Sequence, residues 1–345
     1  MGNKKILVIA AYAGIGDFFL SLPMFETLHQ QYNTKFDILV RSDARFLPFI
    51  RTVDLFSHVY IYDRKGKHSS FSAQFRLLRR LRRQNYEIGF TLHPGKRYVL
   101  MLYLSGAEIR VGGYEYSFLK YFLTHPVPDL KADPIFFRKF QAGEVHGLDC
   151  FFYFLDCLGL KYERKKPVVS LGEIEKSAAI LISGLNKPLI GINTGSSGEA
   201  KNWPLENFLA LAENLKKEKK ASLIFFGGPG EADKFSVFKS RFPADLYAIG
   251  NDFPILLNTA LLKKCDLLIS NDTGLVHIAS FFDLPVISIG GGARTGKAFL
   301  AWSKKSRNLL ESVDCNLLCR ECGNCACVKN IRVESVLKAV DELLS

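Results

Sequence analysis

Two stretches in the second half of the chain combine hydroxyl groups with a basic side chain or a helix start, and both suit a diphosphate. Thr194-Gly195-Ser196-Ser197 leads into Lys201-Asn202-Trp203-Pro204, and hydroxyls and a lysine near a strand end can bind phosphate oxygens. Ser270-Asn271-Asp272-Thr273-Gly274 is followed by His277. Amides at a helix start, together with the Thr273 hydroxyl, form an anion site that His277 could also face. The alternatives are an ordinary surface loop and a structural histidine.

Two glycine-rich turns follow other expected strands. Gly14-Ile15-Gly16-Asp17 comes after the first strand, and its glycines let the backbone approach a ligand closely. Asp17 is either a functional carboxylate or a cap for the helix that follows. Phe19 stands at the third glycine position of the dinucleotide fingerprint, which disfavours a dehydrogenase. In the second turn, Gly227-Gly228-Pro229-Gly230-Glu231, the carboxylate of Glu231 could accept hydrogen bonds from ribose hydroxyls.

Five cysteines near the end of the sequence form a compact cluster. They are Cys315, Cys319, Cys322, Cys325 and Cys327. The middle three have the spacing of metal ligands, and a fourth thiolate from either end of the cluster would complete a tetrahedral zinc or iron site. A zinc ribbon has two separated pairs instead, so reduced thiols and disulfides stay open as alternatives. A metal bound by this cluster would be structural, because chemistry at a diphosphate needs no thiol.

The elements that position these motifs alternate between strands and helices in both halves. The first half has expected strands at residues 6–10, 36–41, 59–62 and 88–92, with helices at 18–32 and 71–84. A charged run ending at Pro167 separates the halves, and the alternation then restarts, with strands expected at residues 189–193, 223–226, 267–270 and 286–289. The pattern predicts an α/β protein with two Rossmann-like, doubly wound domains that bind ligands at the carboxyl ends of their strands. We expect domains at 1–168 and 169–330, the second holding the cysteine-rich segment 315–327, and a C-terminal helix at 331–345.

The net charge of +12 lies mostly in the first domain, where residues 1–168 have 25 Lys and Arg against 15 Asp and Glu. Within the expected helix 71–84, apolar Phe75, Leu78 and Leu81 accompany a basic face that consists of Arg76, Arg79, Arg80 and Arg83. Such a face predicts an acidic partner, namely nucleic acid, anionic lipid or a phosphorylated glycolipid, or else is merely solvated. No apolar run is long enough to span a membrane and no signal peptide is evident, so we expect a cytoplasmic protein.

The order of these motifs resembles glycosyltransferase family 9, the lipopolysaccharide heptosyltransferases. GIGD, the small-residue loop with KNWP, GGPGE and NDTGLVH follow one another over nearly the whole chain. The resemblance implies a GT-B fold, in which two Rossmann-like domains face a central cleft. It also implies inversion at the anomeric carbon, a nucleotide-sugar donor that is typically ADP-heptose, an anionic glycolipid acceptor, and peripheral contact with the inner membrane.

The resemblance also assigns roles to individual residues. Asp17 looks like the catalytic base, with Gly14 and Gly16 in the loop beside it. The donor-binding residues that it implies are Ser196, Ser197, Lys201, Glu231, Phe253, Asp272, Thr273, Gly274 and His277. The acceptor hydroxyl must lose its proton to a carboxylate, while helix-start amides, hydroxyls and Lys201 stabilise the leaving diphosphate without a catalytic metal. The arginine face is then expected to meet the inner leaflet and guide the acceptor.

One departure from the family pattern and two competing functions remain. Where the family has a Gly-Pro-Thr turn, this chain has the loop 290–296, so a hexose or another heptose is an alternative donor sugar. A nucleotide-sugar epimerase on the same fold would need donor contacts but no acceptor. A nucleic-acid-binding protein would use the arginine helix and the cysteine cluster, but no recognisable nucleic-acid motif supports it.

Overall fold

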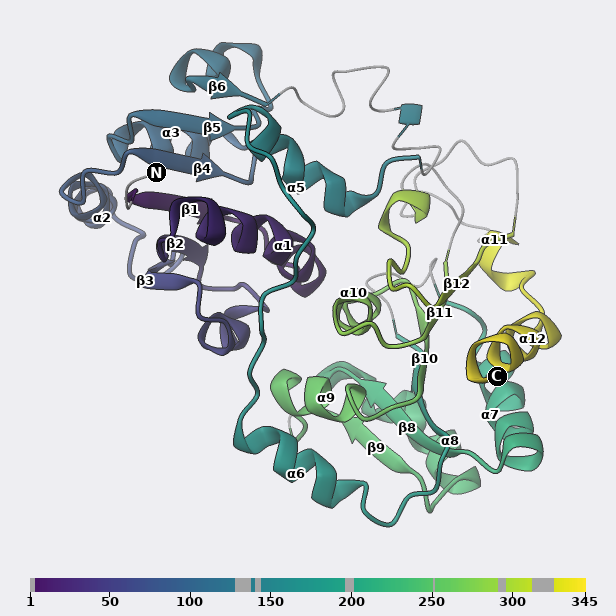
Figure 1. Ribbon diagram of the computed structural model, residues 1–345. Helices are drawn as coiled ribbons and strands as arrows, with labels where there is room; N and C mark the ends of the chain where they lie inside the picture. Colours follow the sequence, from purple (N-terminus) through teal and green to yellow (C-terminus); the bar gives the residue numbers. More distant parts are fainter. Residues whose placement is uncertain are drawn as a thin grey trace. The chain divides into compact units, whose positions relative to one another are not determined.

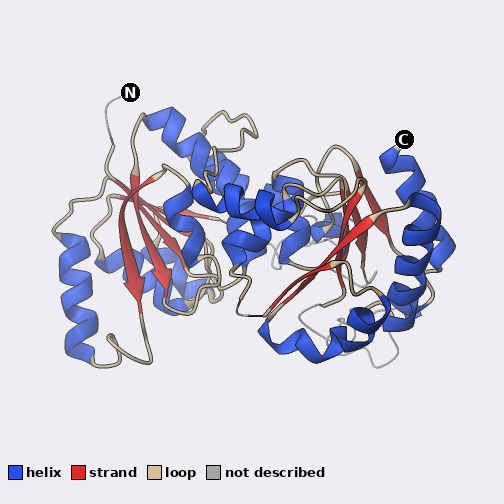
Figure 2. Ribbon diagram, turned by 90° about the horizontal axis from the view of Figure 1, so that it is seen from below, coloured by secondary structure: helices blue, strands red, loops and turns tan. Residues whose placement is uncertain are grey.

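The computed structural model describes residues 4–127, 138–139, 144–195, 202–250, 252–290, 296–311 and 326–345. The chain divides into two compact units, the first comprising Met1–Lys139 and Gly147–Ser170, the second continuing from Leu171 to Ser345. The described residues 144–146 belong with the second unit. Figures 1 and 2 show that each unit is a sheet with helices on both of its faces.

The first unit contains a six-stranded parallel sheet with the strand order β3-β2-β1-β4-β5-β6. All five residues of its central strand β1 are buried, as expected for a strand covered on both faces. The strands are β1 (Ile6–Ala10), β2 (Phe36–Arg41), β3 (Phe56–Tyr62), β4 (Ile88–Thr91), β5 (Ile109–Gly112) and β6 (His125–Pro126). The helices are α1 (Ile15–Tyr32), η1 (Leu47–Thr52), α2 (Phe71–Arg82), α3 (Lys96–Leu104), η2 (Ser117–Phe122) and α5 (Gly147–Asp156).

The second unit repeats this topology, because its sheet has the order β12-β11-β10-β7-β8-β9 and every pair is parallel. Its strands are β7 (Leu189–Asn193), β8 (Ser222–Gly227), β9 (Leu246–Ile249), β10 (Leu267–Asn271), β11 (Val286–Ile289) and β12 (Ser306–Leu309). Its helices are α6 (Glu173–Leu181), α7 (Leu205–Lys219), η4 (Pro229–Phe235), α8 (Ser236–Arg241), α9 (Ile255–Leu262), α10 (Gly274–Phe281), η5 (Gly296–Phe299), α11 (Ala326–Lys329) and α12 (Val333–Leu344).

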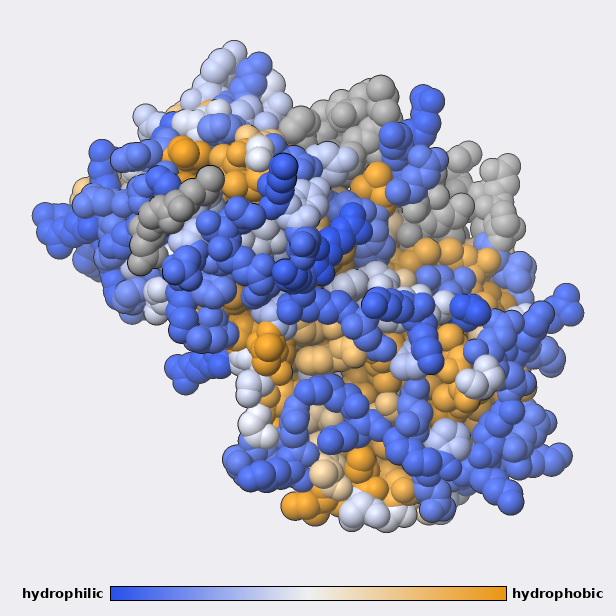
Figure 3. Space-filling model, viewed as in Figure 1, coloured by the Kyte–Doolittle hydropathy of each residue, from blue (hydrophilic) through white to orange (hydrophobic). Residues whose placement is uncertain are grey.

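The terminal helix α12 belongs to the core of the second unit. Val336, Val340 and Leu343 lie on one side of α12 at helical spacing and are buried with residues of β7, β8 and α7. This helix therefore covers the sheet rather than forming a separate part. On the face of the molecule in Figure 3, hydrophilic residues form most of the surface and apolar residues gather in patches.

The expected face of α2 is wrong in one respect. Its buried residues are Ala73, Leu77 and Leu81, spaced by four, and Ser70 caps the helix by accepting a hydrogen bond from the Ala73 amide at 3.3 Å. Phe75, expected to pack inward, is 58% exposed. The reason is the helical period: a residue two positions from both Ala73 and Leu77 points about 200° away from them.

Candidate active site

The strand order places a topological switch point in each unit, between β1 and β4 in the first and between β7 and β10 in the second. In open α/β sheets, ligands bind outside the carboxyl ends of the strands at such points. Asp17 follows β1, and the Asp272-Thr273 pair follows β10. Each of these sequence candidates therefore lies at the switch point of its own unit.

Asp17 lies in the first turn of α1, and its carboxylate folds back over the turn before it. A Cβ atom at Gly14 would lie 2.6 Å from Asp17 Oδ2, so the space that the carboxylate occupies depends on that glycine. Gly14 is the N-cap residue of α1 and provides no side-chain cap. The Asp17 carboxylate has no hydrogen bond or ion pair within the described part of the chain. The nearby Tyr12 hydroxyl bonds instead to Ser21 Oγ at 2.6 Å.

The electrostatic state of Asp17 follows from this position. Burial raises the pKa of the Asp17 carboxyl group to about 6, because the charged form loses hydration and gains no partner. The pKa of Asp43, at the same edge of the sheet, is lowered instead by its hydrogen bonds to Arg41. Asp17 is thus ionised at neutral pH but holds a proton more readily than an ordinary aspartate, which is the property of a general base.

A buried hydrogen-bond network joins β7 and β10 at the second switch point. Asn193 Nδ2 donates to Ser270 Oγ at 3.0 Å and to Thr273 Oγ1 at 3.1 Å. The Thr273 hydroxyl therefore accepts a hydrogen bond from Asn193, and it does not cap α10. The first amides of α10 keep the orientation of an anion site.

Asn271 ties three of the sequence motifs together and was missed as a site residue. Its side chain donates to the Thr194 carbonyl at 2.6 Å and accepts from the Trp203 amide at 3.0 Å. Trp203 is itself buried, and its Nε1 donates to the Ile331 carbonyl at 2.8 Å. The signal in the sequence was an amide side chain at the end of an apolar strand, where a buried polar group must find partners.

Glu231 and Gly195 bring the loops after β7 and β8 together. Glu231 Oε2 accepts from the Gly228 amide at 2.8 Å. A Cβ atom at Gly195 would lie only 2.0 Å from Glu231 Oε1, so this carboxylate packs directly on the Gly195 backbone. The contact explains why a glycine is needed at position 195. Glu231 thus has a defined position beside the Asn271 network.

His277 is buried in α10 beside Phe299, with the ring centroids 6.5 Å apart. Burial lowers its pKa to about 4, because desolvation disfavours the imidazolium form. Its Nδ1 atom has no hydrogen-bond partner within the described part of the chain. His277 is therefore neutral at physiological pH, and it could meet an anion only as a neutral hydrogen-bond donor.

The remaining donor candidates divide between described and undescribed positions. Phe253 is half-buried just before α9, and Asp272 donates its amide to the Ile289 carbonyl at 3.1 Å. Gly274 is the first residue of α10. Ser196, Ser197, Lys201 and residues 291–295 of the loop after β11 lie outside the described residues.

Four of the five clustered cysteines, Cys315, Cys319, Cys322 and Cys325, also lie outside the described residues. Cys327 is a free thiol buried in the core of the second unit beside Val328 and Ile331. Within the described ranges, no group of three or more His, Cys, Asp or Glu residues could hold a metal ion. The metal site stays a prediction.

The four arginines expected on a basic face of α2 are all exposed: Arg76, Arg79, Arg80 and Arg83. The Arg80 guanidinium lies over the Tyr60 ring, 5.1 Å from its centroid. In the part of the chain that is described, no helix has both the length and the apolar character needed to cross a membrane.

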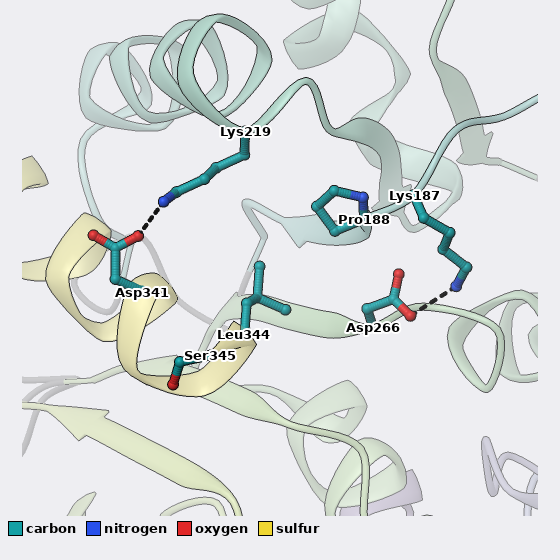
Figure 4. Close-up of a pocket in the computed structure, with 7 residues that line it drawn as sticks. All are labelled: Lys187, Pro188, Lys219, Asp266, Asp341, Leu344 and Ser345. Carbon is teal, nitrogen blue, oxygen red and sulfur yellow. Dashed lines mark hydrogen bonds and ion pairs between the residues drawn. The ribbon is translucent and has the colours of Figure 1, made fainter.

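The cavity in Figure 4 is a different feature. It has a volume of about 860 Å³ and lies where Lys187 and Asp266 precede β7 and β10, at the amino ends of the strands. Its charges are paired, because Lys187 Nζ lies 2.7 Å from Asp266 Oδ1 and Lys219 pairs with Asp341. It therefore lies at the opposite edge of the sheet from Asn271 and Thr273 and offers an anion no unpaired cation.

Comparisons with known proteins agree with the motifs. Residues 74–321 match the model of a family described as glycosyltransferase family 9 (heptosyltransferase). The chain is 25% identical to lipooligosaccharide heptosyltransferase 2 of Campylobacter jejuni over 224 residues, which cover 60% of this chain and 67% of that protein.

Two solved structures share the fold. A family 9 glycosyl transferase from Veillonella parvula has a TM-score of 0.80 at 22% identity, covering 100% of this chain and 98% of that one. The ADP-heptose lipopolysaccharide heptosyltransferase II of Escherichia coli has a TM-score of 0.76 at 19% identity, covering 99% and 98%. With the two doubly wound units, this similarity confirms the GT-B fold.

Proposed function

The chain belongs to glycosyltransferase family 9, the heptosyltransferases, and on that premise we propose that it transfers a heptose from ADP-heptose to a lipopolysaccharide-core acceptor with inversion at the anomeric carbon. This membership confirms the resemblance of the motifs. It does not fit a nucleotide-sugar epimerase or a nucleic-acid-binding protein. The similar Escherichia coli protein is named for ADP-heptose, and that name supports this donor.

The observation that carries the mechanism is the state of Asp17. It is a half-buried carboxylate with a pKa of about 6 and no partner among the described residues, at the switch point of the first unit. In the proposed reaction Asp17 takes the proton of the acceptor hydroxyl while its oxygen attacks the anomeric carbon of the donor. The bond from that carbon to the β-phosphate oxygen breaks, and ADP leaves with the additional negative charge.

We propose that the second unit stabilises this leaving group. The amides at the start of α10 and the Thr273 hydroxyl, held in place by Asn193, would bind the diphosphate with Ser196, Ser197 and Lys201. His277 would contribute a neutral hydrogen bond, Glu231 would accept from the ribose hydroxyls, and Phe253 would pack against the base. Fixed dipoles of this kind stabilise developing charge without a catalytic metal.

The test has two parts. Thermal unfolding in the presence of ADP-, GDP- and UDP-sugars identifies the donor, since only a ligand of the folded state raises the melting temperature. Transfer of the best donor to a heptose-deficient core acceptor then tests the reaction, with the anomeric configuration of the product determined by NMR. A donor that is hydrolysed or epimerised without an acceptor would contradict the proposal.

We also propose that the enzyme works peripherally at the inner membrane, where the arginines of α2 meet the anionic acceptor and lipid. Each basic residue near such a surface contributes about 1 kcal/mol, and the attraction fades within a Debye length. Changing Arg76→Glu and Arg79→Glu together should weaken binding to anionic vesicles at low salt and raise the acceptor KM. Unchanged vesicle binding would leave these arginines as a solvated face.

A further inference from the structure

The exposed aromatic side chains of the described chain are concentrated in one part of the first unit. Of the large apolar residues that are exposed, six are aromatic, and all six lie between residues 71 and 121: Phe71, Phe75, Tyr103, Tyr116, Phe118 and Tyr121. Phe71 is 86% exposed and Tyr121 is 77% exposed. Aromatic rings left in water at this density mark an interaction surface.

These rings belong to one layer of the fold. Helix α3 contacts both α2 and η2. The inner sides of these three elements enter the same core through Leu77, Leu102 and Leu119. Because the inner sides cover one face of the sheet, the outer sides form one outward surface. We call this surface the α2–α3–η2 face.

Helix α2 shows how the aromatic and basic groups are arranged on this face. Phe71, Phe75, Arg79 and Arg82 are spaced by four, four and three residues, so they form a single line along the helix. This line lies opposite the buried line of Ala73, Leu77 and Leu81. The two phenylalanines occupy the first two turns, and the arginines occupy the last.

The charge of the segment is strongly positive. Residues 64–121 contain twelve Lys and Arg but only three Glu, a net charge of +9. Three of the exposed rings lie under cations, since Lys96 covers Phe118, Lys120 covers Tyr121 and Arg110 covers Tyr103, all within 6 Å of the ring centroids. Rings flanked by cations suit the boundary between lipid headgroups and acyl chains, where one end of a side chain is apolar and the other is wet.

We propose that the α2–α3–η2 face docks on an anionic lipid bilayer, with its exposed rings inserted at headgroup level and its basic groups on lipid phosphates. The charge complementarity favours this partner over a protein, because nearly all the charge is of one sign. The proposal rests on the proposed function, in which the acceptor is held in a membrane. It adds an apolar contribution that does not depend on the arginines.

The orientation of the docked enzyme follows from the topology. Helix α2 follows β3, α3 follows β4 and η2 follows β5, so Phe71, Lys96 and Tyr116 all lie toward the carboxyl ends of the strands. Asp17 follows β1 at that same edge. Tyr103, the next-to-last residue of α3, lies toward the other edge. Docking through the end of the face that holds Phe71 and Tyr116 would therefore bring the edge that holds Asp17 to the membrane surface, where the glycan of a lipid-anchored acceptor emerges.

The experiment uses the full chain and vesicles of phosphatidylethanolamine with phosphatidylglycerol, with pure phosphatidylcholine for comparison. The variant Phe71→Ser/Phe75→Ser removes two rings and no charge. The control variant Val168→Ser/Ile180→Ser removes two residues of similar exposure, 83% and 74%, outside the face. Flotation is measured at low salt and at roughly 0.5 M salt, where screening shortens the reach of charges to a few ångströms.

We expect the parent and the control to float with anionic vesicles, and part of this binding to persist at high salt. The phenylalanine variant should bind at least about tenfold more weakly at high salt, because apolar insertion is insensitive to screening. Its donor-induced thermal shift and its transfer to a water-soluble acceptor fragment should match the parent. A Phe75→Trp variant should show blue-shifted emission on anionic vesicles only.

Equal flotation of the phenylalanine variant and the parent at both salt concentrations would overturn the proposal. So would a Phe75→Trp emission that does not change on vesicles. If the parent transfers sugar to the soluble acceptor but never floats, this proposal and the membrane contact of the α2 arginines both fail, while the proposed transfer reaction stands. If transfer fails for every donor while flotation behaves as expected, the proposed function fails instead.

Discussion

The two units share one strand order, but the polar side chains at their switch points differ in their hydrogen bonding. In the second unit, Asn193 and Asn271 are buried and hydrogen-bonded, and they fix Thr273, Thr194 and Trp203. In the first unit, Asp17 is left without a partner among the described residues. The same topology therefore holds one buried hydrogen-bond network and one carboxylate without a partner among the described residues.

This difference matches the two tasks that we propose for these sites. A leaving diphosphate is best stabilised by dipoles that are already oriented, since reorganisation during the reaction costs free energy. A base must change its protonation state, and a carboxylate held by strong hydrogen bonds would have too low a pKa to do so. If this comparison is right, changes in the first unit should affect chemistry, and changes in the second should affect folding and donor binding.

The largest expected effect is on catalysis. Asp17→Asn keeps the size of the side chain but cannot accept a proton, so kcat should fall by about a hundredfold or more. Donor affinity, measured by calorimetry with ADP, should stay within about twofold of the parent. In the parent, kcat should also decline as the pH falls below about 6, where Asp17 becomes protonated.

A matched control tests whether any lost carboxylate has this effect. Asp54 is an exposed residue paired with Lys35, and it lies two residues before β3, at the amino edge of the sheet. Asp54→Asn should leave kcat unchanged. Near-normal turnover of Asp17→Asn would reduce Asp17 to a helix-start residue and would remove the contrast between the two units.

The next largest expected effect is on the stability of the second unit. Asn271→Ala leaves the Thr194 carbonyl and the Trp203 amide without their partners in a buried site. The free energy of unfolding should fall by about 2–4 kcal/mol, within the range for unsatisfied buried groups. Urea unfolding measures this, with the exposed Asn186→Ala as control. A loss of donor affinity with full stability would mean that Asn271 contacts the donor directly.

A smaller expected effect is on ligand affinity, and it distinguishes binding of the diphosphate from binding of the nucleoside. Thr273→Ala should weaken ADP binding by about 1–3 kcal/mol, the range for a hydrogen bond to a charged group. Adenosine binding should hardly change, and Thr273→Ser should restore ADP binding. Lys201→Ala should behave in the same way. Equal losses for ADP and adenosine in isothermal titration would contradict the assignment of these residues to the diphosphate.

Much of the fold could be predicted because buried parallel strands are continuous apolar runs. The strands β1, β2, β7 and β11 have the bounds expected from such runs. The short strand β5 and the edge strand β12 were missed, since both are only partly buried and contain polar residues. An apolar run in the sequence indicates a buried strand, so strands that are only partly buried give a weaker pattern and are harder to predict.

The candidate site could be recognised in the sequence where glycine and hydroxyl motifs follow strands. It was harder to recognise where a side chain holds its neighbours through a buried hydrogen-bond network. The motifs led to Asp17 and Thr273, but Asn193 reads as the last residue of a strand. Its role in the network comes from its hydrogen bonds to Ser270 and Thr273, which lie about 80 residues further along the chain. The register of α2 was also misjudged, because an amphipathic helix with a second, exposed apolar line has two candidate buried faces.

The smallest expected effect is on stability, and its sign distinguishes a base from a cap. Asp17 has a pKa of about 6 in the folded protein against an ordinary value of 3.8, so the folded state binds its proton more tightly than the unfolded state. The free energy of unfolding contributed by this group therefore falls as the pH rises from about 4 to 6.

Above pH 6 the fold bears the full cost of a charged, desolvated carboxylate. Asp17→Asn should remove that cost and raise the free energy of unfolding by on the order of 1 kcal/mol at pH 7.5, with a much smaller gain at pH 4, where the folded-state carboxyl group is protonated. Urea unfolding at these two pH values distinguishes the two roles. A variant less stable than the parent at pH 7.5 would mean that the Asp17 carboxylate stabilises the start of α1 as a cap, which would contradict its assignment as a general base.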